Sequence, residues 1–150
     1  MISIKPPYKI LCDKLSIFLA GSIEMGVADN WQERIENKLS NVDIIIFNPR
    51  RDNWNSNWEQ SINNKNFVEQ VEWELDSLKK SDIIIMYLDP NTKSPISLLE
   101  LGLYAQSNKI VVCCPDGFYR KGNVDVVCNY YNIPVYDSID DMIDYILKQL

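Results

Sequence analysis

The sequence predicts an α/β fold, a three-layer, doubly wound sandwich built on a mainly parallel sheet of about five strands. Short apolar runs alternate along the chain with longer segments whose apolar residues have helical spacing. The apolar runs lack polar alternation, which is typical of strands that are buried on both faces of a parallel sheet. The chain has 150 residues, of which 46% are hydrophobic, and this is enough for one core. We therefore expect a single domain over residues 1–150.

Five apolar runs are predicted strands, and they cover residues 16–20, 43–47, 82–88, 109–114 and 134–136. The predicted helices cover residues 27–39, 66–80, 96–107, 124–131 and 140–150. In the second helix, the apolar side chains expected to face the sheet are Phe67, Val71, Leu75 and Leu78. Alternating strands and helices with right-handed crossovers give the doubly wound arrangement of flavodoxin-like and Rossmann-like proteins.

The charge and the apolar runs of the chain limit its partners. The net charge is −6 and the pI is about 4.6, so we expect no duplex nucleic acid partner, although a local cluster could bind a small polyanion. The apolar runs are too short to span a bilayer and the N-terminus lacks a signal-peptide core, so we expect no membrane partner and a cytoplasmic location. The cysteines show no CxxC spacing and are interpreted as reduced core thiols; they are Cys12, Cys113, Cys114 and Cys128.

Glu100 is the residue that most needs an explanation, because it lies in the otherwise apolar segment 97–105, just beyond a predicted strand. A carboxylate among apolar neighbours loses hydration, so it is retained only where it is paired or takes part in chemistry. The chain has no histidine, which excludes Ser-His and Cys-His catalysis and leaves carboxylates as the expected reactive groups. We expect this segment to open a helix and to carry a reactive glutamate.

Ligands of doubly wound sheets bind beyond the carboxyl ends of the strands, so the loops at these ends are the candidate site. The loop 20–26 contains Gly21 and Ser22, and glycine there allows a close backbone approach before a helix with free N–H groups. An ordinary turn that needs glycine for its geometry is an equal alternative, because the phosphate-loop and dinucleotide spacings are absent. The loop 89–95 begins with Asp89 and leads into the segment of the reactive glutamate.

The loop after the second strand carries two arginines, Arg50 and Arg51, close to Trp54 and Trp58. These side chains could form a lid that stacks on a heterocycle and pairs with an anion. The alternative is a surface cation–π cluster without a ligand. The position at a strand's carboxyl end and the length of the polar stretch 52–64 favour an active-site cover.

The helix 66–80 carries a further candidate, Glu74, beside its apolar stripe. Gln70 and Trp73 flank this carboxylate, which favours a patch that faces a ligand. The alternative, which fits most acidic residues of a helix, is a solvated face.

These residues resemble the nucleoside 2-deoxyribosyltransferase superfamily, which includes the deoxynucleoside 5′-monophosphate N-glycosidases. The resemblance is carried by Ala-Gly-Ser-Ile at 20–23, by a helix with a glutamate before the third strand, and by Leu-Glu-Leu-Gly-Leu-Tyr-Ala at 99–105. It extends from about residue 16 to residue 135, and the Glu-Leu-Gly motif is its most specific part.

The resemblance implies roles for individual residues. The family's nucleophile is the glutamate of the Glu-Leu-Gly motif, here Glu100. A second catalytic carboxylate lies eight residues before Asp82, which gives Glu74 where the family usually has Asp, and it would protonate the leaving base. Six residues before the nucleophile the transferases have Asp and the monophosphate glycosidases have Ser, and this chain has Ser94.

The resemblance also implies a homo-oligomer whose site is completed by a neighbouring subunit. A loop after the fourth strand donates an asparagine to the neighbour's pocket in this family, and the segment 120–125 matches at Asn123, with Asp125 as a further substrate-binding candidate. The aromatic pair at Tyr130 and Tyr131 suits a contact between two copies of the chain.

The implied activity is cleavage of the N-glycosidic bond of a nucleoside through a covalent deoxyribosyl-glutamate, with transfer to another base. No cofactor and no metal are expected. The alternatives are hydrolysis of nucleoside 5′-monophosphates, a glycosidase that accepts ribosyl substrates, and a sensing module with little turnover. Ser94 favours a monophosphate, whereas Glu24 would repel a 5′-phosphate unless Arg50, Arg51 or Arg120 compensates. We expect a free or modified nucleoside.

Overall fold

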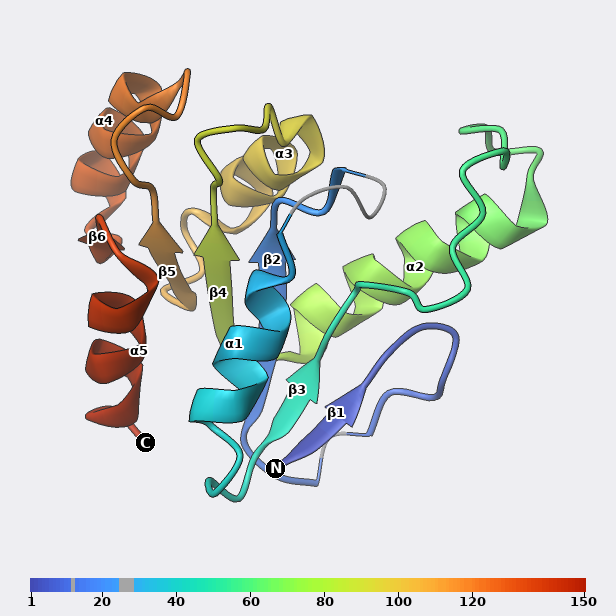
Figure 1. The fold of residues 1–150 in the computed structure, drawn as a ribbon, viewed down its shortest axis with the longest axis horizontal. Helices are drawn as coiled ribbons and strands as arrows, with labels where there is room; N and C mark the ends of the chain where they lie inside the picture. The colour runs from blue at the N-terminus through green and yellow to red at the C-terminus, as the bar shows by residue number, and fades with distance from the viewer. Residues whose placement is uncertain (12, 25–28) are drawn as a thin grey trace. The chain divides into compact units, whose positions relative to one another are not determined.

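The structure is a computed structural model that describes residues 1–11, 13–24 and 29–150. In chain order its elements are β1 (Ile2–Ile4), β2 (Ser16–Gly21), α1 (Trp31–Lys38), β3 (Ile45–Phe47), α2 (Lys65–Lys80), β4 (Ile83–Tyr87), α3 (Pro95–Tyr104), β5 (Ile110–Cys113), α4 (Lys121–Tyr131), β6 (Val135–Tyr136) and α5 (Ile139–Leu147). Figure 1 shows these elements as a ribbon. Among the described residues, no helix is both long enough and apolar enough to cross a bilayer.

The six strands form one sheet with the order β1-β3-β2-β4-β5-β6. The ladders β1/β3, β2/β3, β4/β5 and β5/β6 are all parallel. From β2 the chain passes to β3 on one side, and after β3 it crosses to β4 on the other side of β2, so the sheet is doubly wound. The predicted α/β class is therefore confirmed, with six strands in place of about five.

Consecutive side chains of the strands are buried, which explains the absence of polar alternation in the sequence. In β2, Ile17, Phe18 and Leu19 are at most 1% exposed, and in β4 Ile84 and Ile85 are fully buried. A strand with both faces buried needs a covering layer on each side of the sheet. The predicted layers of helices follow from this burial.

The chain divides into two compact units. Unit 1 consists of Met1–Leu19 and Asn30–Asp82, and unit 2 consists of Ala20–Asp29 and Ile83–Leu150. Unit 1 holds β1, β3, most of β2, α1 and α2, whereas unit 2 holds the end of β2 and all elements from β4 onward.

In unit 1, α1 and α2 lie on opposite faces of the strands (Figure 1). Helix α2 begins where the Asn64 side chain accepts hydrogen bonds from the N–H groups of Asn66 and Phe67. The predicted stripe of this helix is wrong at Leu75, which is 44% exposed. The residues of α2 that are buried are Gln70, Trp73, Ser77 and Leu78.

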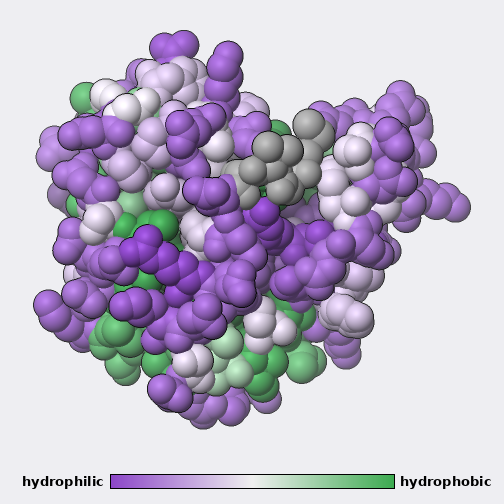
Figure 2. All heavy atoms as spheres, viewed as in Figure 1, coloured by the Kyte–Doolittle hydropathy of each residue, from purple (hydrophilic) through white to green (hydrophobic). Residues whose placement is uncertain are grey.

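The surface of unit 1 is polar where the long loop lies. The loop that follows β3 and the start of α2 are mainly hydrophilic in the space-filling view (Figure 2), as expected for the polar stretch 52–64. This composition keeps the loop on the surface, where water can satisfy its backbone groups.

In unit 2, α5 packs against β5 and β6. The Ser138 side chain caps α5 by accepting a hydrogen bond from the N–H of Asp141, and α4 ends at Asn132, which adopts a left-handed conformation with φ of 55°. Both are common helix-end signals.

Several boundaries differ from the sequence-based expectation. The edge strand β1 was not predicted, because its three residues precede Lys5 and two prolines and form too short an apolar run. Helix α1 begins at Trp31; the first predicted positions of this helix, 27 and 28, lie outside the described residues. Three cysteines, Cys113, Cys114 and Cys128, are buried free thiols, as expected, whereas Cys12 lies outside the described residues.

Candidate active site

Gly21 ends β2 at the carboxyl edge of the sheet, and its backbone requires glycine. Its φ is 135°, and a Cβ at this position would lie 2.1 Å from the carbonyl oxygen of Tyr87 in β4. Only a residue without a side chain allows the two backbones this close. The close packing of one backbone on the other is a geometric reason for glycine at position 21, as in the second interpretation given above. The other glycine of this loop, Gly26, lies outside the described residues.

Three hydroxyl groups form a buried cluster just beyond the ends of β2 and β4. Ser22 Oγ lies 2.7 Å from Thr92 Oγ1 and 2.6 Å from Ser94 Oγ, and the Thr92 and Ser94 oxygens are 2.8 Å apart. Ser22 Oγ also accepts a hydrogen bond from the N–H of Asp89. Ser22 and Ser94 were predicted site residues, and the structure brings them together, with Thr92 as a member that the sequence analysis missed.

Asp89 and Glu24 shape the loop that carries this cluster. Asp89 Oδ1 accepts hydrogen bonds from the N–H and the side-chain amide of Asn91, which makes a local turn. Glu24 Oε1 accepts from the N–H groups of Lys93 (3.1 Å) and Ser94 (3.0 Å), directly before α3. A carboxylate is favourable at this position because the free N–H groups of a helix start carry partial positive charge. Glu24, and not the Ser94 side chain, therefore caps α3.

Both residues of this contact have strained backbones. Glu24 has φ of 45° and Ser94 has φ of 44°, in the left-handed region that non-glycine residues rarely occupy. Such conformations cost of order 1–3 kcal/mol each and persist only where the surrounding contacts impose them. Here the hydroxyl cluster and the capping carboxylate impose them.

Glu100 lies in the second turn of α3 and is 7% exposed. Its apolar neighbours on the same helix point outward: Ile96 is 60%, Leu99 59% and Leu103 58% exposed. Helix α3 thus buries its carboxylate on the same side as Ser97 and Leu101, while three of its large apolar side chains are exposed. Burial, together with the charge of Glu100 one turn earlier, raises the pKa of the Tyr104 hydroxyl.

Asn123 lies on α4, and not on the predicted loop, whereas Asp125 lies on this helix as predicted. The helix begins at Lys121, three residues earlier than predicted, so both residues belong to its first turns. The Lys121 ammonium contacts Asp125 at 3.5 Å, Asp137 at 2.9 Å and the carbonyl of Cys114 at 2.8 Å. The sequence did not show this network, because Lys121 joins β5, α4 and the end of β6 through tertiary contacts.

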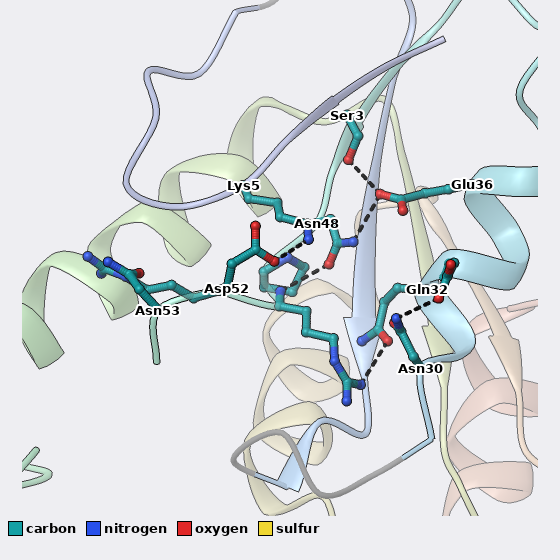
Figure 3. A network of polar contacts seen from close by, with 12 residues as sticks. Ser3, Lys5, Asn30, Gln32, Glu36, Asn48, Asp52 and Asn53 are labelled. Atoms are coloured by element: carbon teal, nitrogen blue, oxygen red, sulfur yellow. Dashed lines mark hydrogen bonds and ion pairs between the residues drawn. The ribbon is translucent and has the colours of Figure 1, made fainter. Parts of the chain in front are cut away.

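In unit 1, the residue after β3 organises the start of the long loop (Figure 3). The buried Asn48 donates from Nδ2 to Glu36 and accepts from the N–H of Arg50 at 3.0 Å. Arg50 then donates from Nη1 to Gln32 Oε1 at 3.4 Å. Arg50, a predicted substrate-binding residue, therefore contacts α1 through Gln32.

Arg51, and not Arg50, lies with the tryptophans. Its side chain is 6% exposed, pairs with Glu69 at 3.0 Å, and places its guanidinium 5.0 Å from the ring centre of Trp58. Trp54 and Trp58 contact each other edge to face, with ring centres 5.2 Å apart. Arg51 and the two tryptophans therefore form one cluster of cation–π and aromatic contacts, and binding of a substrate by Trp54 and Trp58 stays a prediction.

Glu74 has an environment suited to a proton donor. Its Oε1 accepts a hydrogen bond of 2.7 Å from Gln70 Nε2, which also donates to the carbonyl of Pro49. Burial raises the pKa of Glu74 to about 7, although the hydrogen bond from Gln70 opposes the shift. Trp73 differs from expectation: its indole N–H donates to the carbonyl of Tyr8 and its ring packs edge-on against Phe47, so it belongs to the core.

The structure therefore gathers the predicted site residues into separate groups. Unit 2 brings Gly21, Ser22, Asp89 and Ser94 together, directly before the helix of Glu100. Unit 1 joins Gln70 to Glu74 and places Arg51 against Trp58, which contacts Trp54. Within the described ranges, no group of three or more His, Cys, Asp and Glu residues is arranged to hold a metal ion.

Known proteins resemble this chain in fold and in sequence pattern. A crystal structure described as a conserved protein from Enterococcus faecalis V583 superposes with a TM-score of 0.62 over 91% of this chain and 99% of that one. The two are 16% identical, so this similarity concerns the fold alone. A search of curated proteins found no match.

The sequence pattern is more specific than the fold. The family described as nucleoside 2-deoxyribosyltransferase like matches residues 14–118, which is more than half of the chain. The match includes the end of β2 with Gly21 and Ser22, the helix of Glu74, and the helix of Glu100. On the extent of this match, the chain belongs to the nucleoside 2-deoxyribosyltransferase-like family.

Proposed function

We propose that this protein cleaves the N-glycosidic bond of a 2′-deoxynucleoside through a covalent intermediate on Glu100 and transfers the sugar to another base. Membership of the family gives the general kind of reaction, glycosyl transfer on a nucleoside. The observation that carries the proposal is Glu100 itself, a carboxylate that is 7% exposed on a helix that leaves Ile96, Leu99 and Leu103 exposed. Such a carboxylate loses hydration, and carboxylates in such environments are common at catalytic sites.

The proposed chemistry balances with two carboxyl groups. A Glu100 oxygen forms a bond to C1′ while the bond from C1′ to the base breaks, and the bonding pair goes to the base nitrogen. Glu74 gives its proton to that nitrogen. A second base then attacks C1′, the bond to Glu100 breaks, and Glu74 takes up the proton that the incoming base loses.

The pKa of Glu74 supports its assignment as the acid. A carboxyl group with a pKa of about 7 is protonated in a large fraction of molecules at neutral pH, whereas an ordinary glutamate is not. General acids work best when their pKa lies near the working pH.

We propose a free nucleoside as the substrate, in preference to a 5′-monophosphate. Glu24 holds a negative charge on the N–H groups of Lys93 and Ser94, beside the hydroxyl cluster and before the helix of Glu100. A fixed carboxylate there disfavours a dianionic group on the substrate. Ser94 favours the second candidate, a monophosphate N-glycosidase, because the family's monophosphate glycosidases have serine at this position.

We also propose that the protein acts as a homo-oligomer. Ile96, Leu99 and Leu103 form an exposed apolar stripe on α3, and Val126 and Tyr130 are 70% and 77% exposed on α4. Large apolar side chains gathered on helix faces favour association of chains. Asn123, on α4, is the residue that we propose to complete a neighbour's site.

The experiment that tests this function is a product panel. The purified protein is incubated with deoxynucleosides, ribonucleosides and their 5′-monophosphates, with and without a second base, and the products are separated by chromatography. We expect base release from deoxynucleosides and a new nucleoside when the second base is present. Release of base without exchange would support the hydrolase, and binding without release from any substrate would contradict both candidates.

A further inference from the structure

We propose that Gln70 is a positioning residue that determines which carboxyl oxygen of Glu74 carries the proton. This inference rests on the proposed function, in which Glu74 is the proton donor. Gln70 is 5% exposed and lies one helical turn before Glu74 on α2. All the groups that carry the inference belong to unit 1.

The orientation of the Gln70 amide is fixed by a proline carbonyl. Gln70 Nε2 donates to the carbonyl oxygen of Pro49 at 3.0 Å and to Glu74 Oε1 at 2.7 Å. The Pro49 oxygen can only accept a hydrogen bond, so a reversed amide would set two acceptors against each other. Pro49 lies two residues beyond the end of β3, and the sheet thereby fixes the amide.

The oxygen of the Gln70 amide shows that this orientation leaves one polar atom without a hydrogen bond. Gln70 Oε1 is buried and has no hydrogen-bond partner. A buried acceptor without a donor is uncommon and needs an explanation. The explanation is that both donor hydrogens of Gln70 are committed, one to Pro49 and one to Glu74, and that the oxygen must then point away from both.

The fixed amide has a direct consequence for the acid. Because Oε1 of Glu74 already accepts the N–H of Gln70, the proton of the neutral acid is carried by Oε2. The same N–H stabilises the ionised form, and it therefore keeps the pKa of Glu74 below the value that burial alone would give. The nearby charges of Glu69 on α2 and Arg51 on the loop after β3 form an ion pair with each other, at 3.0 Å.

The test compares two variants with the wild-type protein. Gln70→Met keeps the length of the side chain and removes the donor, whereas Ser77→Ala is the matched control, because Ser77 is also fully buried on α2 with an unpartnered hydroxyl. We measure kcat and KM against pH for a natural deoxynucleoside and for a nitrophenyl deoxyriboside, whose leaving group needs no proton.

For Gln70→Met we expect kcat on the natural substrate to fall about tenfold or more, with KM nearly unchanged and with the alkaline limb of the pH profile moved to higher pH. We expect less than about a twofold change on the activated substrate, and wild-type behaviour for Ser77→Ala. Equal losses on both substrates, or an unmoved alkaline limb, would overturn the proposal.

A second measurement on the wild-type protein separates this inference from the proposed function. The side-chain amide of Gln70 and the carboxyl carbon of Glu74 are followed by NMR from about pH 5 to pH 9. We expect both signals to titrate with one midpoint, and we expect the Glu74 midpoint to rise in Gln70→Met. If the protein releases no base but the signals titrate together, the proposed function fails and the Gln70–Glu74 coupling stands. A Gln70 amide that ignores the titration of Glu74 overturns the inference.

Discussion

At the scale of residues, two carboxylates of this protein are held in opposite ways. Glu24 lies at the surface and accepts hydrogen bonds from two backbone N–H groups, whereas Glu74 is half-buried and accepts one from a side-chain amide. The partial burial of Glu74 favours its neutral acid form. These environments fit a fixed negative charge and a proton donor, respectively.

The raised pKa of Glu74 predicts a pH-dependent stability. Its folded-state pKa of about 7 lies above the ordinary value of 4.5, so the folded protein holds this proton more tightly than the unfolded chain. The contribution is complete below pH 4.5 and decreases as the pH rises to about 7, by up to about 3 kcal/mol. Glu74→Gln should remove this part of the slope when urea unfolding is followed from about pH 4.5 to pH 8. An unchanged slope would show that another group causes it.

Glu74 should also matter most for substrates with a poor leaving group. We expect Glu74→Gln to lower kcat on natural deoxynucleosides by about 100-fold or more, because a base needs protonation to leave. The same variant should retain most of its activity on a nitrophenyl deoxyriboside. Steady-state kinetics on the two substrates checks this, and equal losses on both would assign Glu74 a structural role.

At the scale of elements, α3 depends on a cap that comes from another segment of unit 2. Glu24→Gln keeps an acceptor oxygen for the N–H groups of Lys93 and Ser94 and removes the charge, whereas Glu24→Ala removes both. We expect Glu24→Ala alone to lower the free energy of unfolding, by about 0.5–1 kcal/mol.

Both variants of Glu24 should increase the ratio of kcat/KM for the 5′-monophosphate to kcat/KM for the nucleoside. Urea unfolding and kinetics measure the two effects, and an unchanged ratio in both variants would refute the role of the charge.

The strands and helices also show which parts of the fold could be predicted from the sequence. The buried runs of β2 to β5 were predictable, because strands with both faces covered have no polar alternation. The buried face of α2 was not, because Gln70 and Trp73 are buried through hydrogen bonds to Pro49 and Tyr8, which are distant in sequence.

The candidate site, like the fold, could be predicted only in part from the sequence. The burial of Glu100 followed from its apolar segment, and Ser22 and Ser94 were expected at the carboxyl edge of the sheet. The membership of Thr92 in the hydroxyl cluster and the capping role of Glu24 depend on contacts between residues about 70 positions apart. Local spacing carries no signal for such contacts.

At the scale of the whole molecule, the exposed stripe of α3 predicts association of chains. Replacing Leu99 and Leu103 together with glutamate should dissociate the oligomer and lower activity, because charge on both residues prevents burial of the stripe. Leu147→Glu on α5, where the leucine is 41% exposed, is the control and should leave the assembly intact. Light scattering measures the mass, and a wild-type monomer that is fully active at micromolar concentration would contradict the proposal.

A mixing experiment extends this prediction to the site. If Asn123 completes a neighbour's site, inactive Glu100→Gln and inactive Asn123→Ala proteins should regain some activity when their subunits exchange. Exchange without recovery would remove Asn123 from the site.

That residues 1–150 form a single domain stays a prediction of the sequence.

The central claim is that Glu100 is the nucleophile, and it is tested most directly by mapping the covalent intermediate. The reaction is quenched in acid during turnover of a deoxynucleoside, and the peptides are analysed by mass spectrometry. We predict one 2-deoxyribosyl adduct, on the peptide that carries Glu100, and its absence in Glu100→Gln, whose base release should fall by several orders of magnitude. An adduct on another residue, or a Glu100→Gln protein that keeps more than about a tenth of the wild-type rate, a difference of only ~1.4 kcal/mol in the barrier, would contradict the account.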